Sequence, residues 1–297
     1  MDLLLSPQLL AAALIAGALY ALVALGLNLI YGTMRLLNVA HGELVMVGSY
    51  VASWSFSLLG LGPWPALVLS PVAAGLLGYG LYRGLFRRLL ANPALSQRIE
   101  ANSLLLFFGI SIILQNLVSL LFTATPRGYQ PFGGAVIDLG VASVTGGRLL
   151  VLVVAGIVTV AAMLLLRFNT VGLAVKALIQ NREAASLAGI DTEKLERWSF
   201  IAGFAVAGLA GALVSMVEQV SPFMGFPYMI AAFVIIILGG LGNLTGSLIG
   251  GLILGLLETY GVALTSPNYR SILVYGVFIA VLLIRPQGLL GRTRIVR

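Results

Sequence analysis

The stretch QLLAAALIAGALYALVALGLNLIYG, residues 8–32, is a long run without one charged side chain. About 20 apolar residues in a helix cross the hydrocarbon core of a bilayer, so this run is long enough to span a membrane. Eight further apolar runs follow it, at residues 43–60, 64–86, 101–123, 148–166, 197–218, 228–241, 245–263 and 270–285. The run at 228–241 is short for a full crossing. Because lipid offers no partner for backbone polar groups, the sequence predicts an all-α bundle of about eight to nine transmembrane helices.

The composition of the chain excludes a soluble protein. Hydrophobic residues make up 60% of the 297 residues, charged residues only 9%, and the mean hydropathy is +1.06. A soluble domain carries about 25% charged residues. No stretch between the runs is large enough for a separate soluble domain, so residues 1–297 are predicted to form one transmembrane domain. The chain has no cysteine, which excludes disulfides and cysteine-based metal sites.

Basic residues are unevenly distributed between the loops and predict the orientation of the chain. Thirteen of the 17 lie in three clusters: Arg83, Arg87, Arg88 and Arg98; Arg167, Lys176, Arg182, Lys194 and Arg197; and Arg285, Arg292, Arg294 and Arg297. The positive-inside rule places these clusters and the C-terminus in the cytoplasm and the N-terminus outside. The net charge of +7 needs no nucleic acid partner, because anionic membrane lipid is the expected partner of such charge.

The polar segment 167–197 stands between two long apolar runs. Residues 172–188 contain no proline and are mostly good helix formers, so we expect one amphipathic helix there. Gly189 suits the left-handed residue that ends a helix, and residues 191–193 offer N-caps for the next one. The segment is therefore predicted to form a short helix at the cytoplasmic face. An ordinary solvated loop helix is the alternative.

A second polar cluster, Tyr31, Asn38, His41 and Glu43, lies between the first two apolar runs. Ionisable groups near the bilayer centre cost about 2.5–3.5 kcal/mol each on insertion scales, so they usually pair or line a cavity. Arg35 could pair with Glu43. Two hypotheses stay open: a polar turn at the cytoplasmic surface, or residues that gate the pathway or contact substrate.

Further polar residues lie within the predicted spans. Asn28 is a pathway candidate, with helix–helix hydrogen bonding as the alternative. Glu258 lies inside a span and needs an internal partner, whereas Glu218 is expected at the outer interface. His41 is the only histidine, so no histidine-pair metal site is predicted.

The late segment 239–255 is rich in glycine. Its glycines predict either close helix–helix packing or a helix break of the kind that transporters use; they are Gly239, Gly240, Gly242, Gly246 and Gly250. Dinucleotide binding is a poor interpretation, because no soluble βαβ unit surrounds these glycines. The outward loop 126–134, rich in proline and glycine, is a possible contact for an external binding protein.

Several segments resemble one known family. The pattern EAA-x3-G, formed by Glu183, Ala184, Ala185 and Gly189, is similar to the coupling motif of ABC-importer permeases. Residues 17–52, 238–258 and RPQGLLG at 285–291 resemble the branched-chain amino acid permease family, in its LivH-like branch. The resemblance implies that the EAA-x3-G residues contact an ATPase. It also implies a second permease subunit, identical or homologous, two ATPase subunits that bind ATP and Mg, and an external substrate-binding protein.

These observations predict a transport subunit and not an enzyme. The function that the resemblance implies is inward transport of branched-chain amino acids in a bacterial or archaeal plasma membrane, driven by separate ATPase subunits. The expected mechanism is alternating access. The chain has no P-loop of its own, and no cofactor is expected on it. The alternatives are the same machinery serving urea or short amides, and an ion-coupled carrier. An intramembrane enzyme is disfavoured, because no nucleophile and base converge in the sequence.

Overall fold

The computed structural model describes residues 6–285 and 288, apart from 124, 129, 139 and 141; the side chains of residues 93 and 94 are also left aside. The tail arginines Arg292, Arg294 and Arg297, and most of RPQGLLG, lie outside the described residues. The helices of the first half are α1 (Pro7–Met34), α2 (His41–Leu59), α3 (Pro63–Leu81), a π-helical turn (Tyr82–Phe86), α4 (Arg87–Ala91), α5 (Pro93–Ser96) and α6 (Ile99–Phe122). A 3-10 turn (Pro131–Gly134) and the antiparallel strands β1 (Val136–Asp138) and β2 (Ser143–Thr145) follow. The second half contains α7 (Gly146–Phe168), α8 (Thr170–Gln180), α9 (Arg182–Leu187), α10 (Thr192–Val214), α11 (Gly225–Gly239), α12 (Leu244–Leu264), a 3-10 turn (Pro267–Tyr269) and α13 (Arg270–Ile284).

The predicted all-α polytopic bundle is confirmed. Each of the nine apolar runs corresponds to one helix, with ends that agree within a few residues. Among the described residues, seven helices are long and apolar enough to cross a membrane. The other two runs form α2 and α11. The short β1–β2 hairpin between α6 and α7 is the one element that the all-α prediction did not include.

Helices α1 and α10 form the centre of the bundle. Nearly all of α1 between Ala18 and Ile30 is buried, and α1 packs most closely against α12 and α10. Helix α10 also packs on α2 and α3. In contrast, α6, α7 and α13 turn most of their apolar surface outward, as expected of helices that face lipid.

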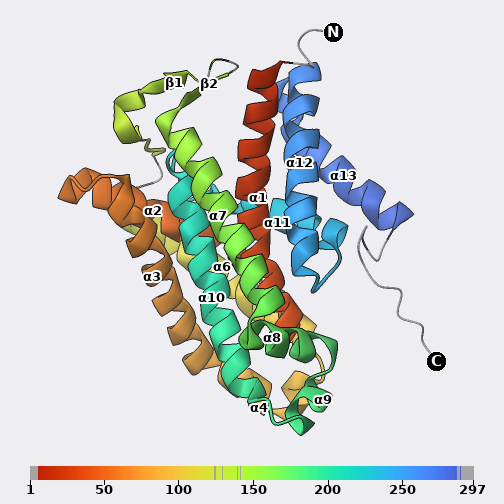
Figure 1. Cartoon of the computed structure of the whole chain (residues 1–297). Helices are drawn as coiled ribbons and strands as arrows, with labels where there is room; N and C mark the ends of the chain where they lie inside the picture. Colours follow the sequence, from red (N-terminus) through yellow and green to blue (C-terminus); the bar gives the residue numbers. More distant parts are fainter. Residues whose placement is uncertain are drawn as a thin grey trace.

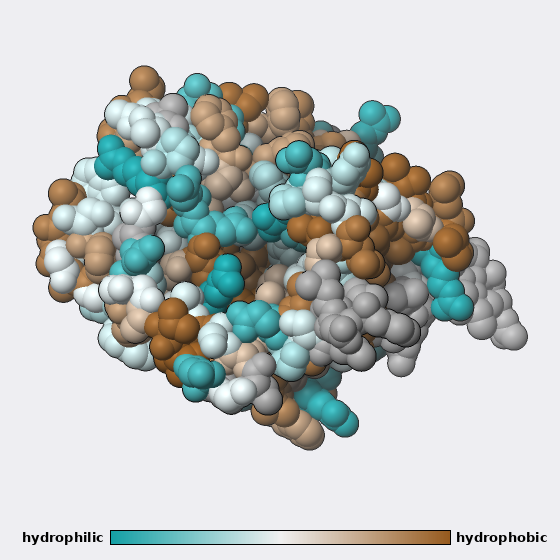
Figure 2. All heavy atoms as spheres, turned by 90° about the horizontal axis from the view of Figure 1, so that it is seen from above, coloured by the Kyte–Doolittle hydropathy of each residue, from teal (hydrophilic) through white to brown (hydrophobic). Residues whose placement is uncertain are grey.

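Different elements form the two ends of the molecule (Figure 1). The start of α1 and the β1–β2 hairpin lie at one end, and α8 and α9 lie at the other. Figure 2 shows the first of these ends, where hydrophilic side chains lie across the middle and hydrophobic ones toward the rim. At this end a backbone bridge joins Arg127 of the α6–α7 loop to Val220, which follows α10.

Two helices begin inside the bundle. Helix α1 ends at Arg35, whose positive φ of 53° stops the helix, and the chain then returns through residues 36–40 to start α2. His41, the first residue of α2, contacts the carbonyl oxygen of Val23, near the middle of α1. Gly42 packs directly against Gly225, the first residue of α11. The first turns of α2 and α11 therefore meet at mid-depth and not at a membrane surface.

Candidate coupling and translocation site

The polar segment forms two short helices where the sequence predicted one. Helix α8 ends at Gln180, because Asn181 adopts an extended conformation, with φ −156° and ψ 111°. The side chain of Asn181 then caps α9 by accepting from the backbone N–H of Ala184 at 3.1 Å. The prediction of one helix over residues 172–188 was wrong, since a side chain that caps helix N-termini competes with the helical ladder.

The ends of this segment are as predicted. Gly189 has φ +82° and no atom would meet a Cβ built on it, so the position requires glycine for its conformation and not for space. Asp191 begins α10 as its N-cap, accepting from the N–H of Lys194 at 2.9 Å. The turn therefore separates α9 from α10 sharply.

The EAA-x3-G residues present a partly open surface. Ala185 is buried at 3% exposure and anchors α9, while Glu183 and Ala184 are exposed. Leu187, two residues beyond Ala185, is 90% exposed. Leu187 lies four residues after Glu183, so the two exposed side chains are neighbours on the surface of α9.

Ion pairs tie this segment to its neighbours. Arg182 pairs with Glu196 of α10 at 2.7 Å, and Glu196 is almost fully buried. Glu193 pairs with Arg87 of α4 at 3.1 Å, although both side chains are more than half exposed. The buried pair is the stronger constraint, because surface pairs contribute about 0–1 kcal/mol.

The glycine-rich segment contains a break as well as close helix packing. The chain leaves α11 at Gly240 and enters α12 at Leu244, with positive φ at Gly240 (92°) and Gly242 (79°). On either side of the break, a Cβ on Gly239 or Gly246 would lie within 2.3 Å of the other residue's backbone. Both predicted roles, a helix break and tight packing, are therefore present in this segment.

Asn28 of α1 holds the break in place. Its Nδ2 donates to the carbonyl oxygen of Asn243 at 2.8 Å and to Oγ of Ser247 at 2.7 Å. Its Oδ1 accepts from the N–H of Gly242 at 2.8 Å, and the side chain is completely buried. These contacts favour the helix–helix hydrogen bonding that the sequence left open, and direct contact of Asn28 with substrate stays a prediction.

The break also touches the polar segment. The side chain of Ile179, on α8, lies against Gly32 of α1 and Gly242 of the break. A bulkier residue at Gly32 would meet Ile179 at 3.2 Å. Movement of α8 would therefore press on the break and on α1 directly.

The predicted cluster of Tyr31, Asn38, His41 and Glu43 is divided by the fold. Tyr31 donates to Glu100 of α6 at 3.3 Å, and His41 faces α1. Glu43 accepts from Ser111 of α6 at 3.3 Å. Asn38 is completely buried, and neither polar atom of its side-chain amide has a hydrogen-bond partner among the described residues.

The suggested pairing of Arg35 with Glu43 was wrong. No ion pair joins them in the part of the chain that the structure describes; Arg35 is exposed and Glu43 is 4% exposed. His41 and Glu43 begin α2 beside the middle of α1, and both hypotheses for the cluster stay predictions. Residues two apart on a helix point in different directions, so His41 and Glu43 serve different neighbours.

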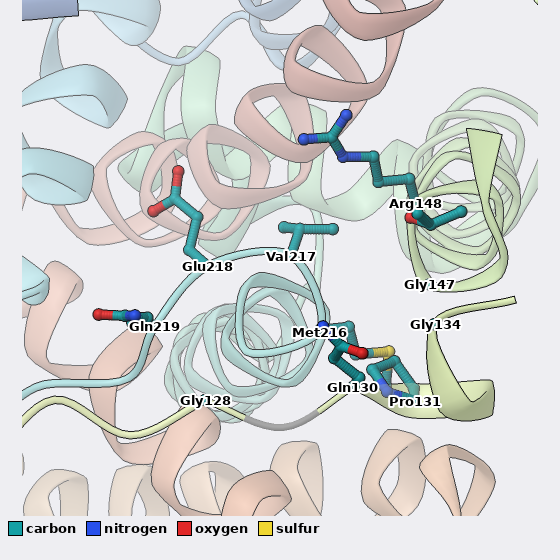
Figure 3. Close-up of a pocket in the computed structure, with 11 residues that line it drawn as sticks. Gly128, Gln130, Pro131, Gly134, Gly147, Arg148, Met216, Val217, Glu218 and Gln219 are labelled. Atoms are coloured by element: carbon teal, nitrogen blue, oxygen red, sulfur yellow. The ribbon is translucent and has the colours of Figure 1, made fainter. Parts of the chain in front are cut away.

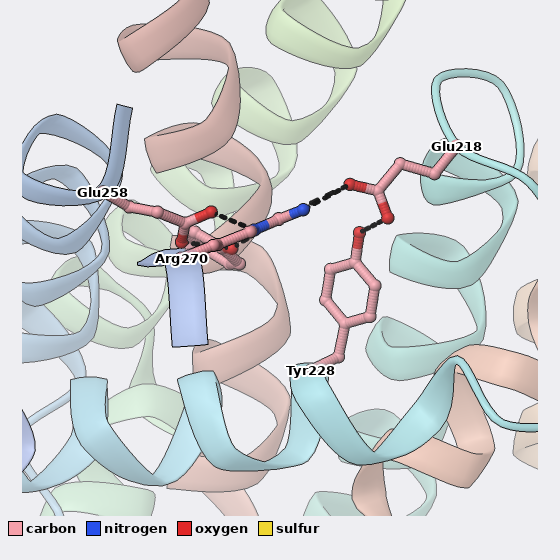
Figure 4. A network of polar contacts seen from close by, with 5 residues as sticks. Glu218, Tyr228, Glu258 and Arg270 are labelled. Carbon is pink, nitrogen blue, oxygen red and sulfur yellow. Dashed lines mark hydrogen bonds and ion pairs between the residues drawn. The ribbon is translucent and has the colours of Figure 1, made fainter. Parts of the chain in front are cut away.

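A polar network lies nearer the hairpin end (Figure 4). Tyr20 donates to Glu258 at 2.6 Å, and Arg270 pairs with Glu258 and donates to the Tyr20 hydroxyl at 3.0 Å. Arg270 also pairs with Glu218 at 3.4 Å, and Tyr228 donates to Glu218 at 2.8 Å. The expected internal partner of Glu258 is therefore Arg270, and the network ties α1, α11, α12 and α13 together.

A polar pocket of 700 Å³ opens beside this network at the hairpin end. Figure 3 shows Arg148 of α7 and Glu218 on different sides of it, with Gln130 and Pro131 of the α6–α7 loop below. Tyr129, part of the predicted contact loop, lies outside the described residues. Among the residues that are described, no group of three or more acidic, histidine or cysteine side chains could hold a metal ion.

Comparison with known proteins identifies the family. The family model described as "Branched-chain amino acid transport system / permease component" matches residues 9–282. The chain belongs to this permease family. It is 32% identical to the high-affinity branched-chain amino acid transport system permease protein BraD of Pseudomonas aeruginosa, over 95% of this chain and 94% of that protein. It is also 32% identical to the permease protein LivH of the corresponding Escherichia coli system, over 94% and 93% of the two chains.

A more distant relative is the permease protein LivM of the same Escherichia coli system, 25% identical over 93% of this chain and 68% of that protein. No solved structure matches the chain. Membership of the permease family, together with the seven apolar helices, makes this a multi-pass membrane protein and a transport subunit.

Proposed function

We propose that this permease carries branched-chain amino acids inward as one subunit of an ATP-driven importer. The observation that carries the proposal is the α8–α9 segment. It presents Glu183 and the bare Leu187 at one end of the molecule, while Ile179 lies against the glycine break. Family membership supports the substrate class, as does the similarity to BraD and LivH, which are permease proteins of branched-chain amino acid transport systems.

The partners follow from the same surfaces. Two ATPase subunits, which bind ATP and Mg, would contact α8 and α9. A second permease subunit, a further copy or a LivM-like chain, would complete the pore, and an external binding protein would deliver substrate to the hairpin end. The chain itself would hydrolyse no ATP.

The orientation is part of this proposal. The N-terminus would lie outside and the C-terminus in the cytoplasm of a bacterial or archaeal inner membrane. Two of the three basic clusters support this orientation: the polar segment 167–197 contains α8 and α9, and Arg87 of the 83–98 cluster pairs with Glu193 of that segment. The mechanism would be alternating access. Closure of the ATPases would displace α8, and Ile179 would pass that displacement to Gly242 and α1.

Co-purification with the ATPase subunits tests the proposal. We expect Leu187→Asp to lose the ATPases and ATP-driven leucine uptake in proteoliposomes, because a charge would enter a covered apolar contact. Leu95→Asp is the matched control, since Leu95 is an exposed leucine of α5, outside the coupling segment, at 41% exposure. The proposed function would be contradicted if Leu187→Asp retained both ATPases, or if the isolated chain concentrated leucine without nucleotide.

A further inference from the structure

Glu43 is a buried carboxylate without a cation. It is 4% exposed, and its Oε1 accepts from Ser111, while its Oε2 has no hydrogen-bond partner in the described part of the chain. Among the residues that the structure describes, none forms an ion pair with it. Ionisable groups inside a membrane bundle are costly, and they usually mark the path of a substrate or ion.

The neighbours of Glu43 show which face of α2 it shares. Tyr50 lies seven residues along α2, two helical turns, and its ring packs on Phe122 of α6 at 5.0 Å between centroids. Trp54 also packs on Phe122, at 4.5 Å. The face of α2 that carries Glu43 and Tyr50 is thus turned toward α6. The Tyr50 hydroxyl is buried, and no described residue forms a hydrogen bond with it.

The facing side of α6 is polar. Ser111 contacts Glu43 and Phe122 contacts Tyr50, so residues spaced by four between them lie on the same side. These residues are Gln115 and Ser119, both only partly exposed. We name Glu43, Tyr50, Ser111, Gln115 and Ser119 the α2–α6 seam. Next to this polar stripe, Phe107, Ile110, Leu114 and Val118 of α6 are buried in the hydrophobic core. The opposite side of α6 exposes leucine, isoleucine and phenylalanine side chains.

The seam begins at the start of two helices. Glu43 lies in the first turn of α2, and its Oε2 occupies the space beside Gly225, where a Cβ would come within 2.8 Å of it. Gly225 is the first residue of the 15-residue α11. The positive ends of both helix dipoles favour a negative charge there without neutralising it. Among the described residues, Oε2 accepts no hydrogen bond, so it remains available to a donor.

We propose that the α2–α6 seam is a wall of the translocation pathway and that Glu43 receives the ammonium group of the transported amino acid. This inference rests on the proposed function and adds the site to it. The aromatic end of the seam, at Tyr50, Trp54 and Phe122, offers an apolar surface for an aliphatic side chain. Ser111 positions the carboxylate through its hydrogen bond to Oε1.

Single cysteines test the seam without a background, because the chain has none of its own. The assembled importer carrying Gln115→Cys is held in lipid nanodiscs and treated with two methanethiosulfonate reagents, the cationic ethyltrimethylammonium derivative and the anionic ethylsulfonate derivative. We expect the cysteine to react with both. After each rate is divided by the reagent's rate with a free thiol, the cationic reagent should react at least tenfold faster. Ile113→Cys, on the outward face of α6 at 65% exposure, should not react.

A second substitution isolates the carboxylate. In the Gln115→Cys background, Glu43→Gln should bring the rate ratio of the two reagents close to one, whereas Glu43→Asp should preserve it. A Gln115→Cys protein that is unreactive in the nanodisc would overturn the seam as a pathway. A ratio unchanged by Glu43→Gln would overturn the role of Glu43.

Uptake measurements connect the site to transport. We expect Glu43→Gln to reduce ATP-driven leucine uptake at least tenfold while the ATPases still co-purify; undiminished uptake would overturn the ammonium site. If the wild-type complex shows no ATP-driven uptake, the proposed function fails. The charge selectivity at position 115 would still be measurable, so the two failures are distinguishable.

Discussion

The contact between Asn28 and the glycine break gives a quantitative prediction. Asn28→Leu keeps much of the side chain's shape and removes three hydrogen bonds, to Asn243, Ser247 and Gly242. Side-chain hydrogen bonds in membrane proteins contribute about 0.6 kcal/mol each on average and up to about 1.7. Three such bonds give about 2 kcal/mol of lost unfolding free energy. The loss should exceed this, because a buried backbone N–H left without a partner costs about 1–3 kcal/mol more.

The measurement is the free energy of unfolding by equilibrium denaturation in mixed micelles. Asn116→Leu is the control. Asn116 is exposed on α6, and its described hydrogen bond goes to the carbonyl oxygen of Ile112 in its own helix. We expect the control to change stability by no more than about 0.5 kcal/mol. In the same reconstituted importer, Asn28→Leu should lower substrate flux without reducing ATPase binding.

A double-mutant cycle with Ser247 isolates one of the three bonds. Ser247→Ala alone should cost about 0.6–1.7 kcal/mol, and it should cost nearly nothing in the Asn28→Leu background. Substitutions at the surface change the free energy of unfolding by about 0.5 kcal/mol or less. If the unfolding free energy of Asn28→Leu differs from that of the wild type by no more than this, Asn28 does not hold the break. Unchanged flux in that variant would remove Asn28 from the transport mechanism.

Three further predictions concern the helix contacts and the coupling turn. Gly246→Leu should destabilise the protein by about 3 kcal/mol, because its Cβ would lie 2.0 Å from a backbone oxygen of α11. Gly156→Leu is the control and should not destabilise the protein, because the space around Gly156 is open. Thermal unfolding of the two variants measures the difference. Arg270→Gln should cost about 2–3 kcal/mol by the same method, since it leaves Glu258 buried and unpaired, and Glu258→Gln in that background should recover part of the loss. Gly189→Leu should strain the turn by about 1–2 kcal/mol, because Gly189 has a positive φ. This variant should insert into the membrane normally but hydrolyse ATP without coupled uptake. Full uptake coupled to hydrolysis would count against the coupling role of Gly189.

The sequence predicted the spans because the bilayer imposes a simple rule on length and hydropathy. All nine apolar runs became helices, and the caps at Gly189 and Asp191 were as their residue types indicated. Asn181 was missed, although asparagine is a frequent N-cap, because the residues around it are good helix formers.

The polar partners were harder to predict. The sequence indicated that Glu258 needed one but did not single out Arg270. The sequence did not indicate the roles of Tyr20 and Tyr228, because a tyrosine in an apolar run can face lipid as readily as it can donate a hydrogen bond to a buried carboxylate. Pairing across 238 residues, as between Tyr20 and Glu258, depends on which helices become neighbours.

Composition and the spacing of apolar runs were enough by themselves to determine a polytopic helical membrane protein with a polar segment at one face, since each helix must satisfy its own backbone in lipid. Only the tertiary structure decided that α2 begins at mid-depth, that Glu43 faces α6 and not Arg35, and that Ile179 lies against the break. Those features arise from helix–helix packing. The packing depends on contacts between small residues that are far apart in the chain, and no local sequence pattern encodes these contacts.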